Sequence, residues 1–159
     1  MCFARCADYD IADREARRWV DAPGVRRAGN ILTAFIGREW QRGIPSQRIV
    51  LAGISRGGAT ALHTGVRHAR PLAAMLAISC CLPLHQETAV GAYADNRSMP
   101  TLTAHGSQDR VIPFAQSENS RASSRTLGYV VETHTYPMPH AVFTEEVRDI
   151  ADWLRRELG

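Results

Sequence analysis

The sequence predicts an α/β fold in which a mostly parallel sheet has helices on both faces. Apolar, strand-like runs alternate with helix-like segments along most of the chain, and the runs at residues 49–54 and 72–79 are almost entirely apolar. Such runs are typical of parallel strands buried on both faces, and the alternation is typical of a parallel sheet covered by helices. A third observation is the pentapeptide at residues 53–57, which lies where a strand gives way to a helix.

The strands and helices are expected in a regular order. We predict helices over residues 24–43, 57–69, 114–127 and 142–158, strands over residues 49–54, 72–79, 101–105 and 129–135, and an irregular segment over residues 80–100. The first helix has apolar residues at helical spacing and ends at Gly43, a favourable C-terminal cap. The last helix has one apolar stripe, formed by Val142, Phe143, Val147, Ile150, Leu154 and Leu158.

Length and composition favour one globular domain over residues 1–159. The chain has 45% hydrophobic and 22% charged residues and a formal net charge of +3, which are ordinary values for a soluble protein. Its arginines are scattered without interleaved aromatic residues, so nucleic-acid binding is disfavoured. The first ten residues lack the apolar core of a secretory signal, and no apolar run is long enough to span a membrane. We therefore expect a cytoplasmic location.

The four cysteines favour free thiols over disulfides or a metal site. Cys2, Cys6, Cys80 and Cys81 form no C-x-x-C pattern, and neighbouring cysteines rarely pair with each other. The spacings also assemble no zinc ligand set. We expect thiols that are buried or partly buried, and no bound metal.

The pentapeptide Gly53–Gly57 has the form G-x-S-x-G, which predicts a sharp strand-to-helix turn with Ser55 exposed at its tip. Gly53 and Gly57 would let the two backbones approach closely. The backbone N–H of Arg56 would help to stabilise an oxyanion. The competing interpretation is an ordinary hydroxyl in a turn, and the surrounding strand and helix favour the catalytic one.

Asp109 and His140 complete the set that a nucleophilic serine needs, in the order serine, acid, histidine. Each follows a predicted strand, at the sheet edge where open α/β sheets bind ligands. The other candidates have plainer interpretations: His63 and His68 on a helix, His85 in a loop, His134 in a strand, His105 with Gly106 as a turn that holds the Asp109 loop, and Asp8, Asp10 and Asp95 away from strand ends.

Three segments together resemble the phospholipase/carboxylesterase family of α/β-hydrolases: RIVLAGISRGGATALHTG, PTLTAHGSQDRVIP and YPMPHAVFTEEVRDIADWL. The similarity begins near residues 9–11, which resemble the family's W-Y-D-I segment. The resemblance implies an α/β-hydrolase fold with Ser55 as nucleophile, Asp109 as acid and His140 as general base. It implies hydrolysis of a small ester or acyl substrate through an acyl-enzyme, without a cofactor.

The chain departs from the family pattern in two places. Arg56 replaces the usual glutamine after the nucleophile, and the family's N-terminal strands and H-G-x-G loop, which supplies a second oxyanion donor, are not found. We therefore expect an N-terminally shortened member whose exposed sheet edge could support a homodimer. The alternatives are a catalytically impaired remnant of such an esterase and a prolyl-oligopeptidase-type fragment. The segment SCCLPL at residues 79–84 is expected to be either an acyl pocket or buried core.

Overall fold

The computed structural model describes residues 11–12 and 19–159 of the chain. Their elements are β1 (Ile11–Ala12), β2 (Trp19–Val20), α1 (Ala22–Gln41), β3 (Val50–Ile54), α2 (Arg56–Gly65), β4 (Ala74–Ile78), α3 (His85–Gly91), β5 (Thr101–Gly106), α4 (Phe114–Thr126), β6 (Val131–Tyr136) and α5 (Thr144–Leu158), with short 3₁₀ turns at Ser46–Arg48 and Ala94–Asn96. From α1 onward strands and helices alternate as predicted, except that α3 lies in the segment predicted as irregular.

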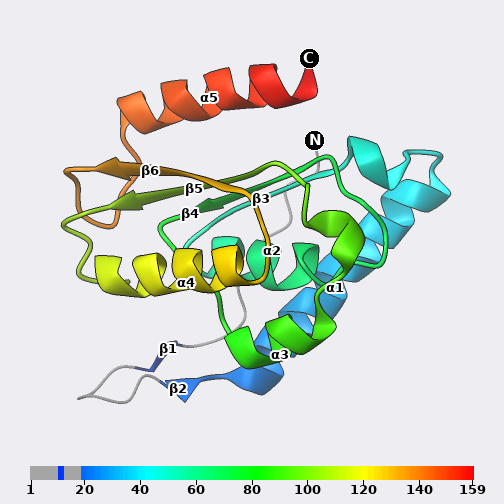
Figure 1. Ribbon diagram of the computed structural model, residues 1–159, viewed down its shortest axis with the longest axis horizontal. Coiled ribbons are helices and arrows are strands. Elements are labelled where there is room, and N and C mark those ends of the chain that lie inside the picture. Colours follow the sequence, from blue (N-terminus) through cyan, green and yellow to red (C-terminus); the bar gives the residue numbers. More distant parts are fainter. Residues whose placement is uncertain (1–10, 13–18) are drawn as a thin grey trace.

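The central sheet has four parallel strands in the order β3-β4-β5-β6 (Figure 1). Each strand follows its neighbour in sequence, and a helix lies between successive strands. All four strands therefore end at one edge of the sheet, and the loops that follow them meet there. A separate antiparallel pair, β1 with β2, was not predicted.

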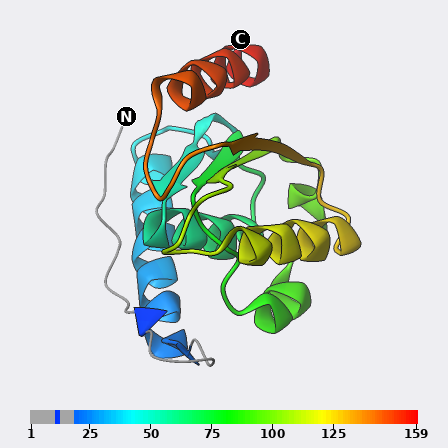
Figure 2. The ribbon, with the colours of Figure 1, turned by 90° about the vertical axis from the view of Figure 1, so that its left-hand side faces the viewer.

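Helices cover both faces of the sheet, as predicted (Figures 1 and 2). On one face α1, α2 and α4 enclose a core that includes Val25, Leu51, Met75 and Tyr129. On the other face α5 packs against the sheet, and Trp153 forms a buried cluster with Leu76, Ile78 and Leu102. All five residues of β4 are buried, which accounts for the unbroken apolar run in the sequence.

The first helix begins and ends where local chemistry favours it. The Asp21 side chain accepts a 3.0 Å hydrogen bond from the N–H of Gly24, and Pro23 lies in the first turn. At the other end Gly43 has a φ of +88°, a left-handed conformation that glycine adopts at little cost. The predicted C-terminal cap at Gly43 is confirmed.

Three predicted details are wrong. Helix α2 ends at Gly65, before residue 69, and the segment predicted as irregular contains α3 and a 3₁₀ turn. In α5, Val147 and Leu158 are exposed, while Val142 and Phe143 precede the helix. The buried face is formed by Trp153 with the partly buried Ile150 and Leu154. The apolar stripe in the sequence did not show which part of the helix packs on the sheet.

Candidate active site

Ser55 occupies the turn between β3 and α2, and its backbone belongs to both elements. Its N–H donates to the carbonyl of Ile78 in β4 (2.8 Å), and its carbonyl accepts from the N–H of Ala59 in α2 (3.0 Å). These bonds hold Ser55 at a φ of +54°, a strained value for a non-glycine residue. Ser55 is also the N-cap of α2, yet its side chain makes no capping bond. A serine at this position ordinarily caps the helix, so this hydroxyl is left for another use.

Glycines beside Ser55 allow the sharp turn, but not in the way that the pentapeptide suggests. A Cβ on Gly53 would lie 2.3 Å from the carbonyl carbon of Gly57, and a Cβ on Gly58 would lie 2.9 Å from both the Gly53 oxygen and Cys80 Sγ. A Cβ on Gly57 would meet nothing within 4 Å. Close approach therefore requires glycine at positions 53 and 58, whereas the close contact expected at Gly57 is absent.

Asp109 lies in the turn after β5, and its carboxylate is held by the backbone of that turn. One oxygen, Oδ1, accepts hydrogen bonds from the N–H groups of Val111 (2.8 Å) and Ile112 (2.9 Å). The Asp109 side chain is fully buried. A buried carboxylate needs such donors, and these two fix its orientation.

His140 lies in the loop after β6 and reaches back to Asp109. Its Nδ1 is 2.7 Å from Oδ2 of Asp109, the oxygen that the backbone donors leave available. The loop also passes close to the end of β5, because a Cβ on Gly106 would lie 2.2 Å from the carbonyl oxygen of Met138. The N–H of Gln108 donates to that carbonyl at 3.1 Å. Glycine at position 106 thus lets the two loops meet.

The surroundings of Asp109 favour its charged form. Burial raises the pKa of the Asp109 carboxyl, but the hydrogen bonds from His140, Ile112 and Val111 together outweigh burial and leave the pKa below its ordinary value. Asp109 is therefore anionic at neutral pH. A proton on Nδ1 of His140 then completes the 2.7 Å bond and leaves Nε2 as the basic nitrogen of the ring.

The three predicted residues lie at one edge of the sheet, after β3, β5 and β6. Asp109 and His140 are in direct contact. Among the described residues no hydrogen bond joins the Ser55 hydroxyl to His140, and such contacts are often loose in the absence of substrate. Arg56 is the first residue of α2, so its backbone N–H lies at the N-terminal end of a helix, where the helix dipole favours a negative charge.

The remaining candidates lie elsewhere, with one exception. His63 is buried in α2, His85 is the first residue of α3 and not a loop residue, and His134 bonds to Glu132 and Tyr136 within β6. Asp8 and Asp10, with residues 2, 6 and 9, fall outside the described residues. The exception is His105, which is part of β5 and lies 3.3 Å from Asp109. The sequence predicted His105 and Gly106 as a turn that holds the Asp109 loop, whereas the structure places His105 in β5 with its side chain beside Asp109.

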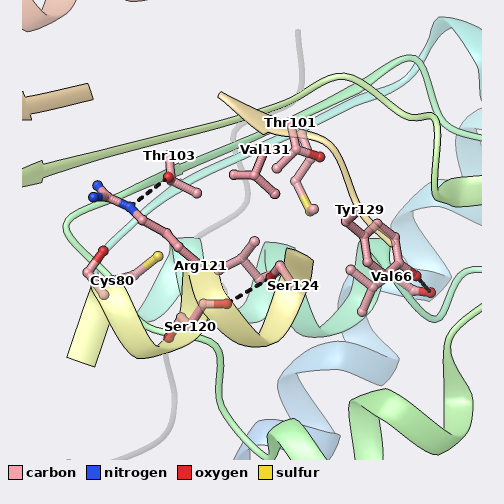
Figure 3. A pocket seen from close by; sticks show the side chains of 12 residues that line it. Val66, Cys80, Thr101, Thr103, Ser120, Arg121, Ser124, Tyr129 and Val131 are labelled. Atoms are coloured by element: carbon pink, nitrogen blue, oxygen red, sulfur yellow. Dashed lines mark hydrogen bonds between the residues drawn. The ribbon is translucent and has the colours of Figure 1, made fainter. Parts of the chain in front are cut away.

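A small cavity lies between α4 and the sheet, on the side of α2 (Figure 3). Its volume is about 20 Å³, enough for one water molecule and too small for an acyl chain. Its lining residues are Leu62, Val66, Met75, Cys80, Thr101, Thr103, Ser117, Ser120, Arg121, Ser124, Tyr129 and Val131. Cys80 and Leu82 belong to the buried core, so for these two residues the core interpretation holds. Cys80 and Cys81 are free thiols, as predicted.

Among the residues that the structure describes, no group of three or more histidine, cysteine, aspartate or glutamate side chains is placed to hold a metal ion. No helix within residues 11–12 and 19–159 has the length and apolar character to span a membrane.

Comparison with known proteins gives matches along nearly the whole chain. Residues 4–158 match the model of the Phospholipase/Carboxylesterase family. The chain is 36% identical over 124 residues to acyl-protein thioesterase 1 of Mycosarcoma maydis (71% of this chain, 49% of the relative). It is 33% identical over 141 residues to acyl-protein thioesterase 1 of Gibberella zeae (87% of this chain, 60% of the relative). The chain thus spans about half to three fifths of the length of these relatives.

A similar solved structure supports the same assignment of fold. The crystal structure of Arabidopsis thaliana SOBER1 superposes with a TM-score of 0.84 at 22% identity, covering 89% of this chain and 68% of that one. This likeness, together with the parallel sheet and its helices, shows the α/β-hydrolase fold. With the family match over residues 4–158, the predicted resemblance is confirmed, and the chain belongs to the phospholipase/carboxylesterase family.

Proposed function

We propose that this chain carries the catalytic residues of a serine hydrolase that cleaves carboxylic esters or thioesters through an acyl-enzyme on Ser55. The observation that carries the proposal is the 2.7 Å bond between His140 and the buried Asp109, at the same sheet edge as a serine that does not cap its helix. A histidine fixed by a carboxylate beside a strained serine turn is the arrangement that nucleophilic catalysis requires.

The first half of the reaction forms the acyl-enzyme. Nε2 of His140 takes the Ser55 hydroxyl proton while Oγ forms a bond to the substrate carbonyl carbon, and the carbonyl oxygen becomes an oxyanion. The Arg56 N–H donates to that oxyanion. Asp109 stays anionic and stabilises the His140 imidazolium. His140 then passes its proton to the leaving alkoxide or thiolate, and the acyl group remains on Ser55.

The second half returns the enzyme to its starting state. A water molecule gives a proton to Nε2 of His140 and attacks the acyl carbon, so that a second oxyanion forms. When this intermediate collapses, the carboxylic acid leaves and Oγ of Ser55 regains the proton from His140. The printed names of the fungal relatives make an acyl thioester on a protein one substrate to test.

A fluorophosphonate probe tests the proposal directly because it reacts with activated serines. We expect labelling of the native chain, none of Ser55→Ala, and undiminished labelling of Ser123→Ala, a control on α4. Folded native protein that takes up no probe would instead identify an inactive remnant.

Substrate choice is tested by comparing p-nitrophenyl acetate, an acyl thioester and a peptide amide. Cleavage of the ester or thioester supports the proposal. Cleavage of the amide alone would favour the prolyl-oligopeptidase type. The cytoplasmic location, the homodimer and the single domain remain predictions.

A further inference from the structure

A second histidine lies against the same carboxylate as His140, on its inner side. His105, the fifth residue of β5, has no exposed surface, and its ring lies beside that of Phe114 with 6.0 Å between centroids. Its Nε2 is 2.9 Å from the carbonyl oxygen of Ile112 and 3.3 Å from Oδ2 of Asp109. We propose that His105 is a positioning residue, whose Nε2–H fixes the 109–112 turn and the Asp109 carboxylate in the orientation that His140 needs.

The contact with Ile112 determines which ring nitrogen carries the proton. A carbonyl oxygen can only accept, so Nε2 of His105 must donate, and Nδ1 then has no proton in the neutral ring. Nδ1 is buried without a hydrogen-bond partner among the described residues, which agrees with this tautomer because a buried N–H donor there would be unpaired. Burial also lowers the pKa of His105, in spite of the nearby Ile112 carbonyl and Asp109, so the ring is neutral at neutral pH.

The same N–H acts on the acid in two ways. It holds Ile112 by its carbonyl, while the N–H of Ile112 donates to Oδ1 of Asp109, so this residue is fixed at both of its backbone polar groups. The positive end of the His105 N–H dipole also lies beside Oδ2, the oxygen that His140 uses. Two backbone donors at Oδ1 and two histidine nitrogens at Oδ2 thus surround the carboxylate.

Packing alone is the competing explanation, since a fully buried ring fills space whatever its hydrogen bonds. The two explanations differ in what replaces the ring. His105→Gln places an amide N–H close to the position of Nε2, whereas His105→Leu fills part of the space without a donor. If His105 positions the acid, glutamine at position 105 should keep the hydrogen bond between His140 and Asp109, whereas leucine should weaken it. His63→Leu is the matched control, because it removes another buried histidine, seven residues after Arg56 along α2 and, among the described residues, without a hydrogen bond or ion pair to Asp109 or His140.

The tautomer and the state of the acid can be measured without turnover. In the ¹⁵N-labelled full chain, NMR should find the His105 proton on Nε2 and a low-field proton on Nδ1 of His140, bonded to Asp109. We expect that low-field signal to persist in His105→Gln and in His63→Leu, and to be lost in His105→Leu. A proton on Nδ1 of His105 in the native chain, or an unchanged His140 signal in folded His105→Leu, would overturn the proposal. If His105→Leu does not fold, the proposal is tested by the tautomer of His105 in the native chain and by whether the low-field His140 signal persists in His105→Gln.

Kinetics then extend the test to the reaction, and this part rests on the proposed function. With p-nitrophenyl acetate we expect His105→Leu to lower kcat on the order of tenfold to a hundredfold with little change in KM, as for a misplaced base. His105→Gln should recover most of kcat. A chain that hydrolyses no ester refutes the proposed function alone, because the NMR signals still decide the role of His105. Equal kcat in the leucine and native proteins contradicts positioning.

Discussion

Replacing Gly106 by alanine should disturb His140 although it changes no catalytic side chain. The added Cβ would lie 2.2 Å from the carbonyl oxygen of Met138 and 2.7 Å from that of Pro139. Both are backbone atoms of the segment that leads to His140, so neither can turn away as a flexible side chain would. To bring the nearer contact to 3.0 Å, that segment must move by about 0.8 Å, since overpacking forces backbone shifts.

The size of the effect follows from the bond that this segment carries. His140 Nδ1 and Asp109 Oδ2 are 2.7 Å apart, and a shift of about 0.8 Å away from Asp109 takes the pair to the limit of hydrogen bonding or beyond it. A misplacement on the order of 1 Å costs about a hundredfold in rate. Overpacking also destabilises by about 1–3 kcal/mol.

Two assays measure these effects: the rate at which a fluorophosphonate labels Ser55, and urea unfolding. We expect Gly106→Ala to label about a hundredfold more slowly while still folding. The matched control is Gly37→Ala in α1, where a Cβ would meet nothing within 4 Å. It should label normally and be more stable by about 0.5–1 kcal/mol, because alanine is the better helix former. Native labelling and stability in Gly106→Ala would refute the steric argument.

Three further substitutions test other parts of the structure. Ser55→Gly should raise the free energy of unfolding by about 1 kcal/mol in urea titrations, because glycine relieves the positive φ; a loss of stability would contradict the strain. Asp109→Asn should lower the free energy of unfolding at neutral pH. This loss relative to the native chain should shrink as pH falls below about 4, because the lowered pKa of Asp109 in the folded chain stabilises it only while the carboxylate is charged. A loss that does not depend on pH would argue against the lowered pKa. Trp153→Ala should cost about 3–5 kcal/mol by calorimetry and the exposed Leu158→Ala far less, so similar costs would contradict the packing of α5.

The parts of the fold that were predictable are those in which burial shapes the sequence directly. Strand β4 is buried at every residue, so its apolar run could only be a strand within a covered sheet or a core helix, and its shortness favoured the strand. The parallel sheet and the placement of Ser55, Asp109 and His140 after strands followed from this alternation, whereas the order of the strands was not predicted. The same reasoning failed for α3, whose seven residues are too few to show a helical period.

The contacts within the site could not be read from the sequence because they depend on loops that meet in space. The sequence does not show that a Cβ at Gly106 would clash with the Met138 carbonyl oxygen, because the two residues are 32 positions apart. For His105 the sequence suggested a turn that holds the Asp109 loop, whereas the backbone continues as strand and the side chain itself lies beside Asp109. Gly57 shows the opposite error, because its place in the motif suggested a close contact that the structure lacks.

Asp109 and His140 lie in different structural surroundings from Ser55. Asp109 follows β5 and is held by backbone N–H groups of its own turn, and His140 follows β6 and is bonded to Asp109. Ser55 follows β3, which within the described sheet has a single neighbour, β4, and whose residues Ala52 and Ile54 are exposed. An edge strand with exposed apolar residues is open to association with another strand or chain. A strand added to β3 would therefore contact the strand that leads to Ser55, at the opposite edge of the described sheet from β6, which precedes His140.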